Sequence, residues 1–264
     1  MTSSATERVS VRVQDGIADV RLNRPDKLNA LDPAMFTGLV EAGEGLMKDA
    51  SLRAVVLSGE GRAFCAGLDF KSFLGASSGD FFERDGDSPA NRAQRVAWIW
   101  QELPVPVIAA VHGVAYGGGL QIALGADMRY ATADAQLSIM EVRWGLVPDM
   151  TGTQTLRHLM RLDVLKELTF TGRVVSGSEG QSLGLVTRVC DDPRAAALET
   201  VREIAKQSPD AVRASKQLLN ASGVASVADG LALEAKLQKA LLGSPNQMEA
   251  VLANFEKRDP KFTP

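Results

Sequence analysis

Three consecutive glycines, Gly117 to Gly119, form a segment that could bind a negatively charged oxygen. They follow an apolar run at 107–111 with the pattern of a buried strand, and a helical pattern extends from Leu120 to Ala126. A glycine turn lets a ligand approach the main chain closely, and the first amides of a helix have no intrahelical acceptor. The helix dipole adds to the attraction of an anion. The glycines could instead serve only to pack the helix tightly on the strand, and both interpretations fit this segment alone.

A second segment rich in small residues, 59–70, follows another apolar strand pattern at 54–57. An enolate or a tetrahedral oxyanion is held well by two backbone donors from different loops, because such donors need no reorganisation during the reaction. The two segments together therefore predict an oxyanion hole.

The two segments also resemble a known family. Ala63-Phe-Cys-Ala-Gly-Leu-Asp69 and His112-Gly-Val-Ala-Tyr-Gly-Gly-Gly-Leu120 are similar to the motifs of the enoyl-CoA hydratase/isomerase (crotonase) superfamily, and the resemblance continues over nearly the whole chain. It implies that the substrate is an acyl-CoA thioester. It also implies that the amides of Leu68 and Gly118 are the two donors.

A carboxylate, Glu141, follows a strand-like run at 137–140. By itself it could be an ordinary surface glutamate. Burial beside apolar Ile139, Trp144 and Leu146 would raise its pKa toward a value useful for proton transfer. The resemblance places Glu141 at the position of the family's acid/base glutamate.

Position 121 departs from the hydratase pattern, which has a second glutamate there. Gln121 can orient water by hydrogen bonds but cannot accept its proton. Asp149 follows Glu141 by eight residues, a spacing that resembles the dienoyl-CoA isomerase branch of the family, and two carboxylates can move a proton between carbons without water. Asp149 could alternatively be an N-cap or turn residue before the helix expected at 153–160.

The resemblance implies further contacts with the substrate. Lys27, Leu28 and Ala30 are expected at the adenine and phosphate end of CoA, and Lys257 in the C-terminal tail is expected to reach CoA as well. For both lysines the alternative is a solvated surface side chain. The other expected contacts are Ala66, Asp69, Phe70, Tyr116, Gly117, Gln121 and Pro148.

The composition narrows the functional classes. The chain has 264 residues, 45% of them hydrophobic, and a net charge of −3, which does not favour nucleic acid as a partner. The N-terminus has no apolar signal core and no apolar run has membrane-spanning length, so we predict a cytoplasmic protein without membrane contact. Cys65 and Cys190 should remain reduced, and with only two histidines we predict no metal site. No cofactor is predicted, because coenzyme A belongs to the substrate.

The expected elements alternate between strands and helices, which predicts an α/β fold. A hairpin is expected over residues 8–22 around a turn at 14–16, because Asp-Gly between alternating apolar residues is a hairpin signal. Helices are expected at 33–48 and 93–103, and further strands at 128–132, 137–140 and 185–189. The resemblance implies a spiral of ββα repeats rather than a doubly wound sheet.

Two regions lie outside this repeat. Residues 71–92 mix aromatic, acidic and glycine residues, and we expect them to form a flap. The pattern Gly75-x-Ser77-x-Gly79 within them lacks the strand and helix that a hydrolase serine needs. From 193 onward the pattern is helical, with segments expected at 209–221, 226–242 and 246–258. We therefore divide the chain into a core at 1–200 and a C-terminal region at 201–264, which the family's pattern predicts to assemble a homotrimer or a dimer of trimers.

The predicted function is the shift of a double bond in an enoyl- or dienoyl-CoA, with an enolate stabilised in the oxyanion hole. Hydration of a 2-enoyl-CoA is the first alternative. A non-catalytic acyl-CoA binder is the second. A serine hydrolase is the third, and it would need His112 or His158 to activate a serine.

Overall fold

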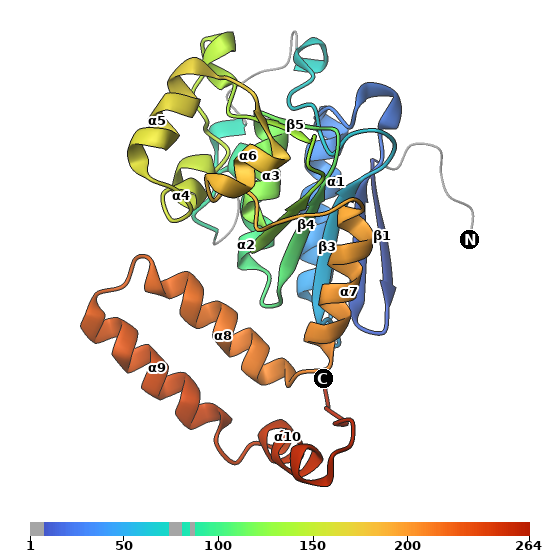
Figure 1. Ribbon diagram of the computed structural model, residues 1–264, viewed down its shortest axis with the longest axis vertical. Coiled ribbons are helices and arrows are strands. Elements are labelled where there is room, and N and C mark those ends of the chain that lie inside the picture. The colour runs from blue at the N-terminus through green and yellow to red at the C-terminus, as the bar shows by residue number, and fades with distance from the viewer. Residues whose placement is uncertain (1–7, 74–80, 85–87) are drawn as a thin grey trace.

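The computed structural model describes residues 8–73, 81–84 and 88–264, and its centre is a six-stranded sheet (Figure 1). The strand order is β1 (Val9–Gln14), β2 (Ile17–Leu22), β3 (Ala54–Gly59), β4 (Val107–Val111), β6 (Met128–Ala131) and β9 (Arg188–Val189). Among the described strands of this sheet only β1 and β2 pair antiparallel, and the predicted hairpin is confirmed. Its two-residue turn has Asp15 and Gly16 at φ values of 52° and 74°, which Asp and Gly tolerate better than most residues.

A second sheet has three strands, β5 (Val114–Tyr116), β7 (Gln136–Ser138) and β8 (Val175–Ser176). The chain passes from β4 to β5 at Gly113, whose φ is 61°. A Cβ at this position would lie 2.1 Å from the carbonyl oxygen of Arg62, so only glycine fits. Successive strands in the two sheets followed by a helix give the ββα repeat that the sequence predicts.

Helices cover both faces of the six-stranded sheet (Figure 1). On one face α1 (Pro33–Met47), α2 (Arg92–Glu102) and α3 (Gly118–Gly125) pack on the odd-numbered side chains of β3 and β4, such as Val55 and Val107. On the other face α7 (Pro193–Ala205) packs on the even-numbered ones. This alternation is the period of two that a strand buried on both faces requires.

Local capping explains where the first helices begin. Asp32 accepts a hydrogen bond from Met35 N at the start of α1, and Asn91 forms a capping box with Gln94 at the start of α2. Proline at position 33 occupies the first turn of α1, where its missing N–H is not needed. Both helices lie within one residue of their predicted bounds.

Three predicted elements are clearly shorter than expected. The strand predicted at 137–140 is β7, which ends at Ser138. The strand at 185–189 is reduced to 188–189, because the amides of Leu185 and Val186 donate to Gly180 O and are not free for the sheet. The helix at 153–160 is α4 (Gly152–Leu156), and α5 (Leu162–Thr171) and α6 (Gly177–Ser182) follow it.

The flap expected at 71–92 is described only in part. Residues 70–73 form a 3-10 turn, and Phe73 and Phe81 pack against Phe36 of α1 with ring centroids 5.8 Å and 5.5 Å away. The Gly75-x-Ser77-x-Gly79 pattern lies outside the described residues.

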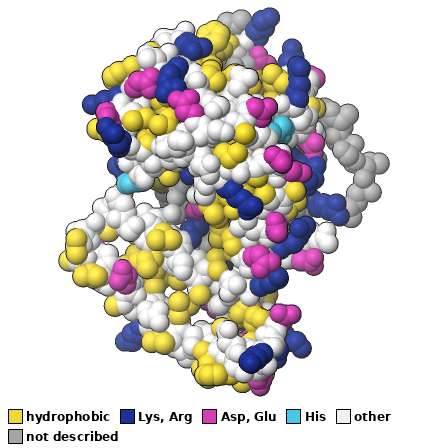
Figure 2. All heavy atoms as spheres, in the orientation of Figure 1, with side chains coloured by type: hydrophobic (Ala, Val, Ile, Leu, Met, Phe, Trp, Pro, Cys, Tyr) yellow, Lys and Arg dark blue, Asp and Glu magenta, His cyan; other side chains and the backbone are white. Residues whose placement is uncertain are grey.

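Three helices complete the chain: α8 (Pro209–Ser222), α9 (Val227–Leu241) and α10 (Pro245–Glu256), close to the predicted ranges. Lys216 fixes α8 to the core through an ion pair with Asp127 at 2.8 Å and hydrogen bonds to the carbonyl oxygens of Trp100 and Val105. No residue of α9 is buried, and Figure 2 shows hydrophobic side chains on the surface of this helical arm. Within the described ranges, no helix is both long and apolar enough to cross a membrane.

Candidate active site

The first predicted donor, the amide of Leu68, is oriented by a parallel β-bridge between Leu31 and Leu68. Leu31 N donates to Gly67 O at 2.8 Å, and Asp69 N donates to Leu31 O at 2.9 Å. In such a bridge the middle residue directs its own N–H away from the partner. Among the described residues, Leu68 N has no hydrogen-bond acceptor, so it is available to a ligand.

The second predicted donor, Gly118 N, is the first amide of α3 and has no intrahelical acceptor. Gly117 N, one residue earlier, is already used because it donates to Ser138 O at 2.9 Å. A Cβ at Gly67 would lie 2.6 Å from Tyr116 O and 3.8 Å from Gly118 N. The two donor loops are therefore in direct contact, with their free amides on neighbouring segments of main chain.

The sequence left open whether the three glycines provide free amides for an anion or allow the helix to pack tightly, and the structure shows a different feature at each glycine. Gly117 adopts a φ of 51° at the N-cap of α3, and Gly118 offers the free amide. Gly119 is required for packing, because a Cβ there would lie 2.4 Å from Cys65 O. The turn thus combines a free amide with tight packing, so the two interpretations do not exclude each other.

Glu141 begins a 3-10 turn at 141–144 and is 8% exposed. A Cβ at Gly117 would lie 3.4 Å from Glu141 Oε1, which places the carboxyl group beside the glycine turn. Oε1 accepts a hydrogen bond from Gln121 Nε2 at 2.6 Å, whereas Oε2 is buried without a partner among the described residues. Burial raises the pKa of Glu141 above the ordinary value of 4.5, and the negative charge of Asp149 raises it further.

Gln121 is 1% exposed, and its side-chain oxygen is also occupied. Oε1 accepts two hydrogen bonds, from Met150 N and from Gly152 N, each 2.9 Å long. Both lone pairs of the amide oxygen are used, and one of the two Nε2 protons is donated to Glu141. Gln121 is therefore part of the framework around Glu141.

Asp149 lies closer to the surface than Glu141, but the surrounding protein still raises its pKa through loss of hydration. It does not cap α4, because Thr151 occupies the N-cap position of that helix. The N-cap alternative is therefore wrong, whereas the turn alternative is confirmed, because Asp149 lies in the turn that precedes α4. Asp149 is the one charged group whose field acts on Glu141 within the described part of the chain.

Comparison with known proteins identifies the family of the chain. The family model described as enoyl-CoA hydratase/isomerase matches residues 12–264. The chain belongs to the enoyl-CoA hydratase/isomerase family.

Individual relatives agree with this assignment. The chain is 35% identical to the mitochondrial Delta(3,5)-Delta(2,4)-dienoyl-CoA isomerase of Mus musculus, with 94% of this chain and 79% of the mouse protein covered. It is also 35% identical to the mitochondrial enoyl-CoA hydratase domain-containing protein 2 of Bos taurus, with coverage of 94% and 84%. Among solved structures, an enoyl-CoA hydratase from Bacillus anthracis superposes with a TM-score of 0.89 at 30% identity, covering 97% of this chain and 98% of that one. The predicted family, fold class and enzyme class, isomerisation or hydration of an acyl-CoA, are confirmed.

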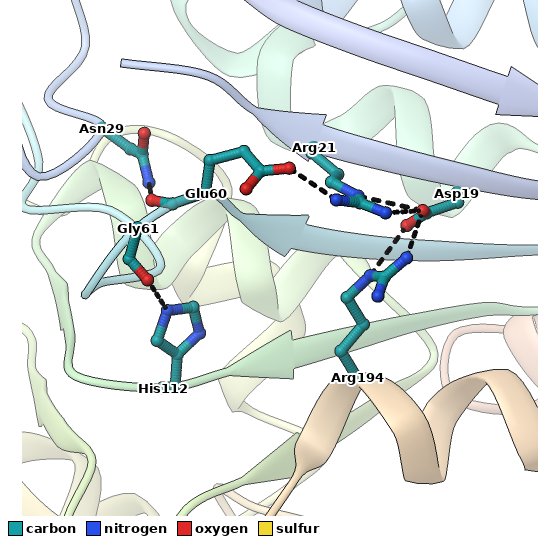
Figure 3. Close-up of polar contacts among 7 residues, drawn as sticks. All are labelled: Asp19, Arg21, Asn29, Glu60, Gly61, His112 and Arg194. Atoms are coloured by element: carbon teal, nitrogen blue, oxygen red, sulfur yellow. Dashed lines mark hydrogen bonds and ion pairs between the residues drawn. The ribbon is translucent and has the colours of Figure 1, made fainter. Parts of the chain in front are cut away.

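In this family member the loop expected at CoA is built around Asn29, which the sequence patterns did not reveal. Asn29 is fully buried in a left-handed conformation with φ of 56°. Its Nδ2 donates to Glu60 O at 2.9 Å (Figure 3) and to Ala63 O at 2.8 Å, and its Oδ1 accepts from Arg24 N. Asparagine tolerates positive φ better than most residues, and this was the available signal.

The predicted CoA-side residues lie around Asn29. Lys27 is exposed at the end of a 3-10 turn, and Leu28 is left-handed with φ of 51°. Leu28 O accepts a hydrogen bond from Ala66 N, while Ala30 O accepts one from an Arg24 guanidinium. Ala66, also a predicted contact, thus ties this loop to the first donor loop.

Other predicted contacts have partners within the protein. Asp69 is paired with Arg24 at 2.9 Å, and hydrogen bonds from Ser72 and Arg24 lower the pKa of its carboxyl. Tyr116 donates its hydroxyl to Gln136, and Pro148 is half-buried in the loop before Asp149.

An aromatic pair joins the donor loop to the turn that carries Glu141. Phe70 packs on Trp144 with ring centroids 4.5 Å apart. Both rings are substantially exposed, at 36% and 60%. They therefore form an apolar surface beside the two segments that carry Leu68 and Glu141.

Lys257 does not lie near the donors within one chain. It ends α10 in a left-handed conformation, and Figure 1 shows α10 at the end of the molecule opposite β5 and α3. The prediction that Lys257 contacts CoA would require a site on another copy of the chain.

The histidines do not support the hydrolase alternative. His112 Nε2 lies 2.9 Å from Gly61 O (Figure 3), and His158 Nε2 accepts from Arg157 Nε at 2.9 Å. Neither imidazole contacts a serine hydroxyl in the described part of the chain. His112 instead supports the turn that precedes the first donor loop.

Three cavities lie away from these groups. One of about 630 Å³ opens between α1 and α2, one of about 940 Å³ separates α8 from the core, and one of about 670 Å³ lies between α2, α8 and α9. None of the three is lined by Leu68, Gly118 or Glu141. The site is therefore defined by its donors and carboxylates rather than by cavity size.

Proposed function

We propose that this enzyme shifts a double bond of an enoyl- or dienoyl-CoA, in fatty-acid or related acyl-CoA catabolism. The observation that carries the proposal is the pair Glu141 and Asp149, two interacting carboxyl groups of which Glu141 is buried and Asp149 is exposed, and the pKa of each is raised above its ordinary value. The third position near them, 121, holds a neutral amide. Two titratable groups in different surroundings can take the roles of base and acid.

The proposed reaction is a proton transfer between two carbons. The thioester oxygen accepts hydrogen bonds from the amides of Leu68 and Gly118. These hydrogen bonds make the C–H protons of the carbons next to, or conjugated with, the carbonyl group more acidic. The free Oε2 of Glu141 accepts one such proton, and the electron pair of the broken C–H bond forms an enolate held by the two amides. In the proposed step Asp149 begins protonated and donates its proton to a different carbon, and the proton taken up by Glu141 then returns to Asp149 before the next turnover. One C–H bond is broken and one is formed, so no water is consumed.

Occupation of the Gln121 side chain supports isomerisation over hydration. Its oxygen already accepts from Met150 N and Gly152 N, so it cannot also accept a hydrogen bond from a water molecule. Activation of water would then depend on Glu141 alone. The second candidate is nevertheless hydration of a 2-enoyl-CoA, which is favoured by similarity to solved enoyl-CoA hydratases such as that of Mycobacterium smegmatis, at 32% identity, TM-score 0.86 and coverage of 96% of this chain and 98% of that one.

For substrate binding we propose that Lys27, Leu28 and Ala30 contact the nucleotide end of CoA. Lys27 is exposed and the loop is fixed by Asn29, so the loop can bind phosphate without rearrangement. Phe70 and Trp144 would contact the apolar part of the substrate. We propose no further cofactor.

The proposed assembly is a homotrimer or a dimer of trimers, in which Lys257 reaches CoA bound to a neighbouring subunit. The proposal is supported by the exposed apolar side chains of the helical arm, among them Leu231, Met248 and Phe255. The proposed location remains the cytoplasm, although relatives from Mus musculus and Bos taurus are named as mitochondrial proteins.

Product identification tests the proposed reaction. Matched 2-enoyl-, 3-enoyl- and 3,5-dienoyl-CoA substrates should give positional isomers, and the 3-hydroxyacyl product of hydration should be minor. Asp149→Asn should reduce isomerisation by about 10²-fold or more, as expected for loss of a proton-transfer group, and should affect residual hydration less. Efficient hydration together with a neutral Asp149→Asn variant would show that the enzyme is a hydratase. CoA binding without turnover of any of the three substrates would indicate a non-catalytic binder.

A further inference from the structure

One side-chain amide contacts the surroundings of both proposed proton-transfer groups. The geometry points to Gln121 as a positioning residue that joins Glu141 to the loop carrying Asp149 and leaves Oε2 of Glu141 as the one reactive oxygen. This inference rests on the proposed proton-transfer function and adds a role for a residue that does not itself exchange a proton.

The orientation of the amide is fixed by its partners. Met150 N and Gly152 N are both donors, so the group facing them must be the amide oxygen, and the Nε2 group must face Glu141. A reversed amide would set N–H groups against N–H groups. The three hydrogen bonds, 2.9, 2.9 and 2.6 Å long, therefore specify one orientation in a side chain that is 1% exposed.

The hydrogen bond from Gln121 makes the two oxygens of Glu141 different. Oε1 is held by Nε2 of Gln121 and lies against Gly117, whereas Oε2 has no partner among the described residues. A carboxylate free to rotate could present either oxygen to the substrate. Fixing Oε1 reduces this freedom and directs proton transfer to Oε2.

The two other hydrogen bonds restrain the loop that follows Asp149. Met150 is its direct neighbour, and Thr151, between the two donors, has a φ of 76°. This conformation is unfavourable for a β-branched residue and persists only where surrounding contacts impose it. Thr151 Oγ1 is also buried without a partner in the described structure, so its own side chain does not provide those contacts. The side-chain oxygen of Gln121 provides such contacts, because it accepts hydrogen bonds from the amides on either side of Thr151.

A neutral amide suits this position better than a carboxylate. A glutamate at 121 would still accept from Met150 N and Gly152 N, but it would bring a negative charge to within hydrogen-bond distance of Glu141 Oε1. Two carboxylates at that distance cannot both ionise readily, so one would retain a proton. Gln121 instead donates to Glu141 and offsets part of the rise in pKa caused by burial. The charged groups on the elements packed here are Asp149, which acts on Glu141, and Arg143, which acts on Tyr116.

Two substitutions separate the two functions of the amide. Gln121→Met keeps the size of the side chain and removes all three hydrogen bonds, while Gln121→Glu keeps an acceptor for Met150 and Gly152 and replaces the neutral amide donor to Glu141 with a second carboxyl group. Gln181→Met is the matched control, because the Gln181 side chain is exposed on α6 and makes no hydrogen bond among the described residues. The measurements are the pH profile of kcat/KM and hydrogen exchange at the amides of Met150 and Gly152.

The expected results differ between the variants. Gln121→Met should lower kcat on the order of 10²-fold with KM little changed, because the base is misplaced rather than removed. Its acidic limb should move to higher pH, and the two amides should exchange roughly 2- to 10-fold faster, as expected for one lost hydrogen bond each. Gln121→Glu should also move the acidic limb to higher pH but should leave exchange at both amides unchanged. Gln181→Met should match the wild type in every measurement.

The proposal is wrong if Gln121→Met leaves the pH profile and the amide exchange unchanged. It is also wrong if Gln121→Glu moves the acidic limb to lower pH or exposes the two amides. If Gln121→Met does not fold, the pH profile and the amide exchange of Gln121→Glu still test the proposal. If the wild type proves to be a hydratase, the proposed isomerase function fails, but the same pH profile measured for hydration tests Gln121 independently. If no substrate turns over, titration of the Glu141 carboxyl by carbon-13 NMR replaces the rate profile.

Discussion

The carboxyl group of Glu141 is buried, with one oxygen hydrogen-bonded and the other unpartnered among the described residues. Its pKa is higher in the folded protein than in the unfolded chain, so the folded state binds the proton more tightly. The free energy of unfolding contributed by this group therefore falls as the pH rises through the folded-state pKa, and it is largest below the unfolded value. Above the folded-state pKa, the buried negative charge of Glu141 lowers the stability of the protein.

Glu141→Gln should separate activity from stability. Turnover should fall about 10²- to 10⁴-fold because a general base is lost, while affinity for CoA should not change. The melting temperature at neutral pH should rise, and the difference from wild type should shrink as the pH falls through the folded-state pKa. Calorimetry between neutral and mildly acidic pH checks this, and a lower melting temperature of the variant at neutral pH would contradict it.

The second prediction at this scale concerns the Gly118 amide. Gly118→Ala and Gly118→Pro both introduce a Cβ facing Met150 Sδ at 2.8 Å and Leu31 Cδ1 at 3.1 Å, but only proline removes the N–H. The proline variant should have a kcat about 10²- to 10³-fold below that of the alanine variant, the effect of one lost oxyanion donor. Steady-state kinetics on the folded variants measures this difference, and equal kcat values would exclude Gly118 N as a donor.

Sequence patterns located several of these residues because their signals are local. A run of glycines before a helix and a carboxylate after a strand mark Gly118 and Glu141, and the family resemblance adds Leu68. The partners of Gln121 come from residues 20 to 31 positions away, so no local pattern shows that its oxygen is already occupied. Asn29 was missed for the same reason, since its side chain supports carbonyl groups more than 30 residues away.

At the scale of elements, α3 lies so close to the first donor loop that Gly119 has no space for a side chain. A Cβ would meet Cys65 O at 2.4 Å, and a backbone oxygen in a β-bridge cannot move aside easily. Gly45 is the opposite case, since it is exposed in α1 and a Cβ added there would meet nothing within 4 Å.

Alanine at these two glycines should therefore have opposite effects. Gly119→Ala should destabilise the protein by about 1–3 kcal/mol, as overpacking does, or prevent folding. Gly45→Ala should stabilise it by about 0.5–1 kcal/mol, because alanine favours the helix and restricts the unfolded chain. Urea unfolding of both variants checks the signs, and a neutral Gly119→Ala would show that α3 and the donor loop separate easily.

The elements themselves were more predictable than their ends. Buried strands such as β3 and β4, and the capped helices α1 and α2, follow from apolar patterns and capping residues in the sequence. The strand predicted at 185–189 was too long because its apolar residues are buried against α6 rather than paired in the sheet. The two-sheet arrangement depends on the turn at Gly113, where the need for glycine comes from the carbonyl oxygen of Arg62 in another loop.

At the scale of the molecule, the helical arm is attached to the core at α8 while α9 remains uncovered (Figure 1). Side chains such as Val227, Leu231 and Phe255 are 60–82% exposed in the single chain. Apolar surface of this kind is covered in stable proteins, and the proposed trimer would cover it with a second and third copy.

Leu231→Glu should therefore weaken assembly. Introducing a charge into an apolar contact between subunits leaves it without water or a partner, so the variant should sediment as smaller species at micromolar concentration. Glu234→Gln, one turn along the same exposed helix, is the control and should sediment like the wild type. A wild-type protein that sediments as a monomer would contradict the proposed assembly.

The two proposed oxyanion donors belong to the main chain, and this has an evolutionary consequence. Their positions depend on a β-bridge and on the start of a helix. A substitution that leaves this backbone in place therefore also leaves the two proposed hydrogen bonds to the thioester oxygen in place. The side chains at 121, 141 and 149 can change without disturbing it. A gene duplicate could therefore acquire a new reaction through one or two substitutions while still binding its old substrate, and natural selection would act on a weak activity rather than on none.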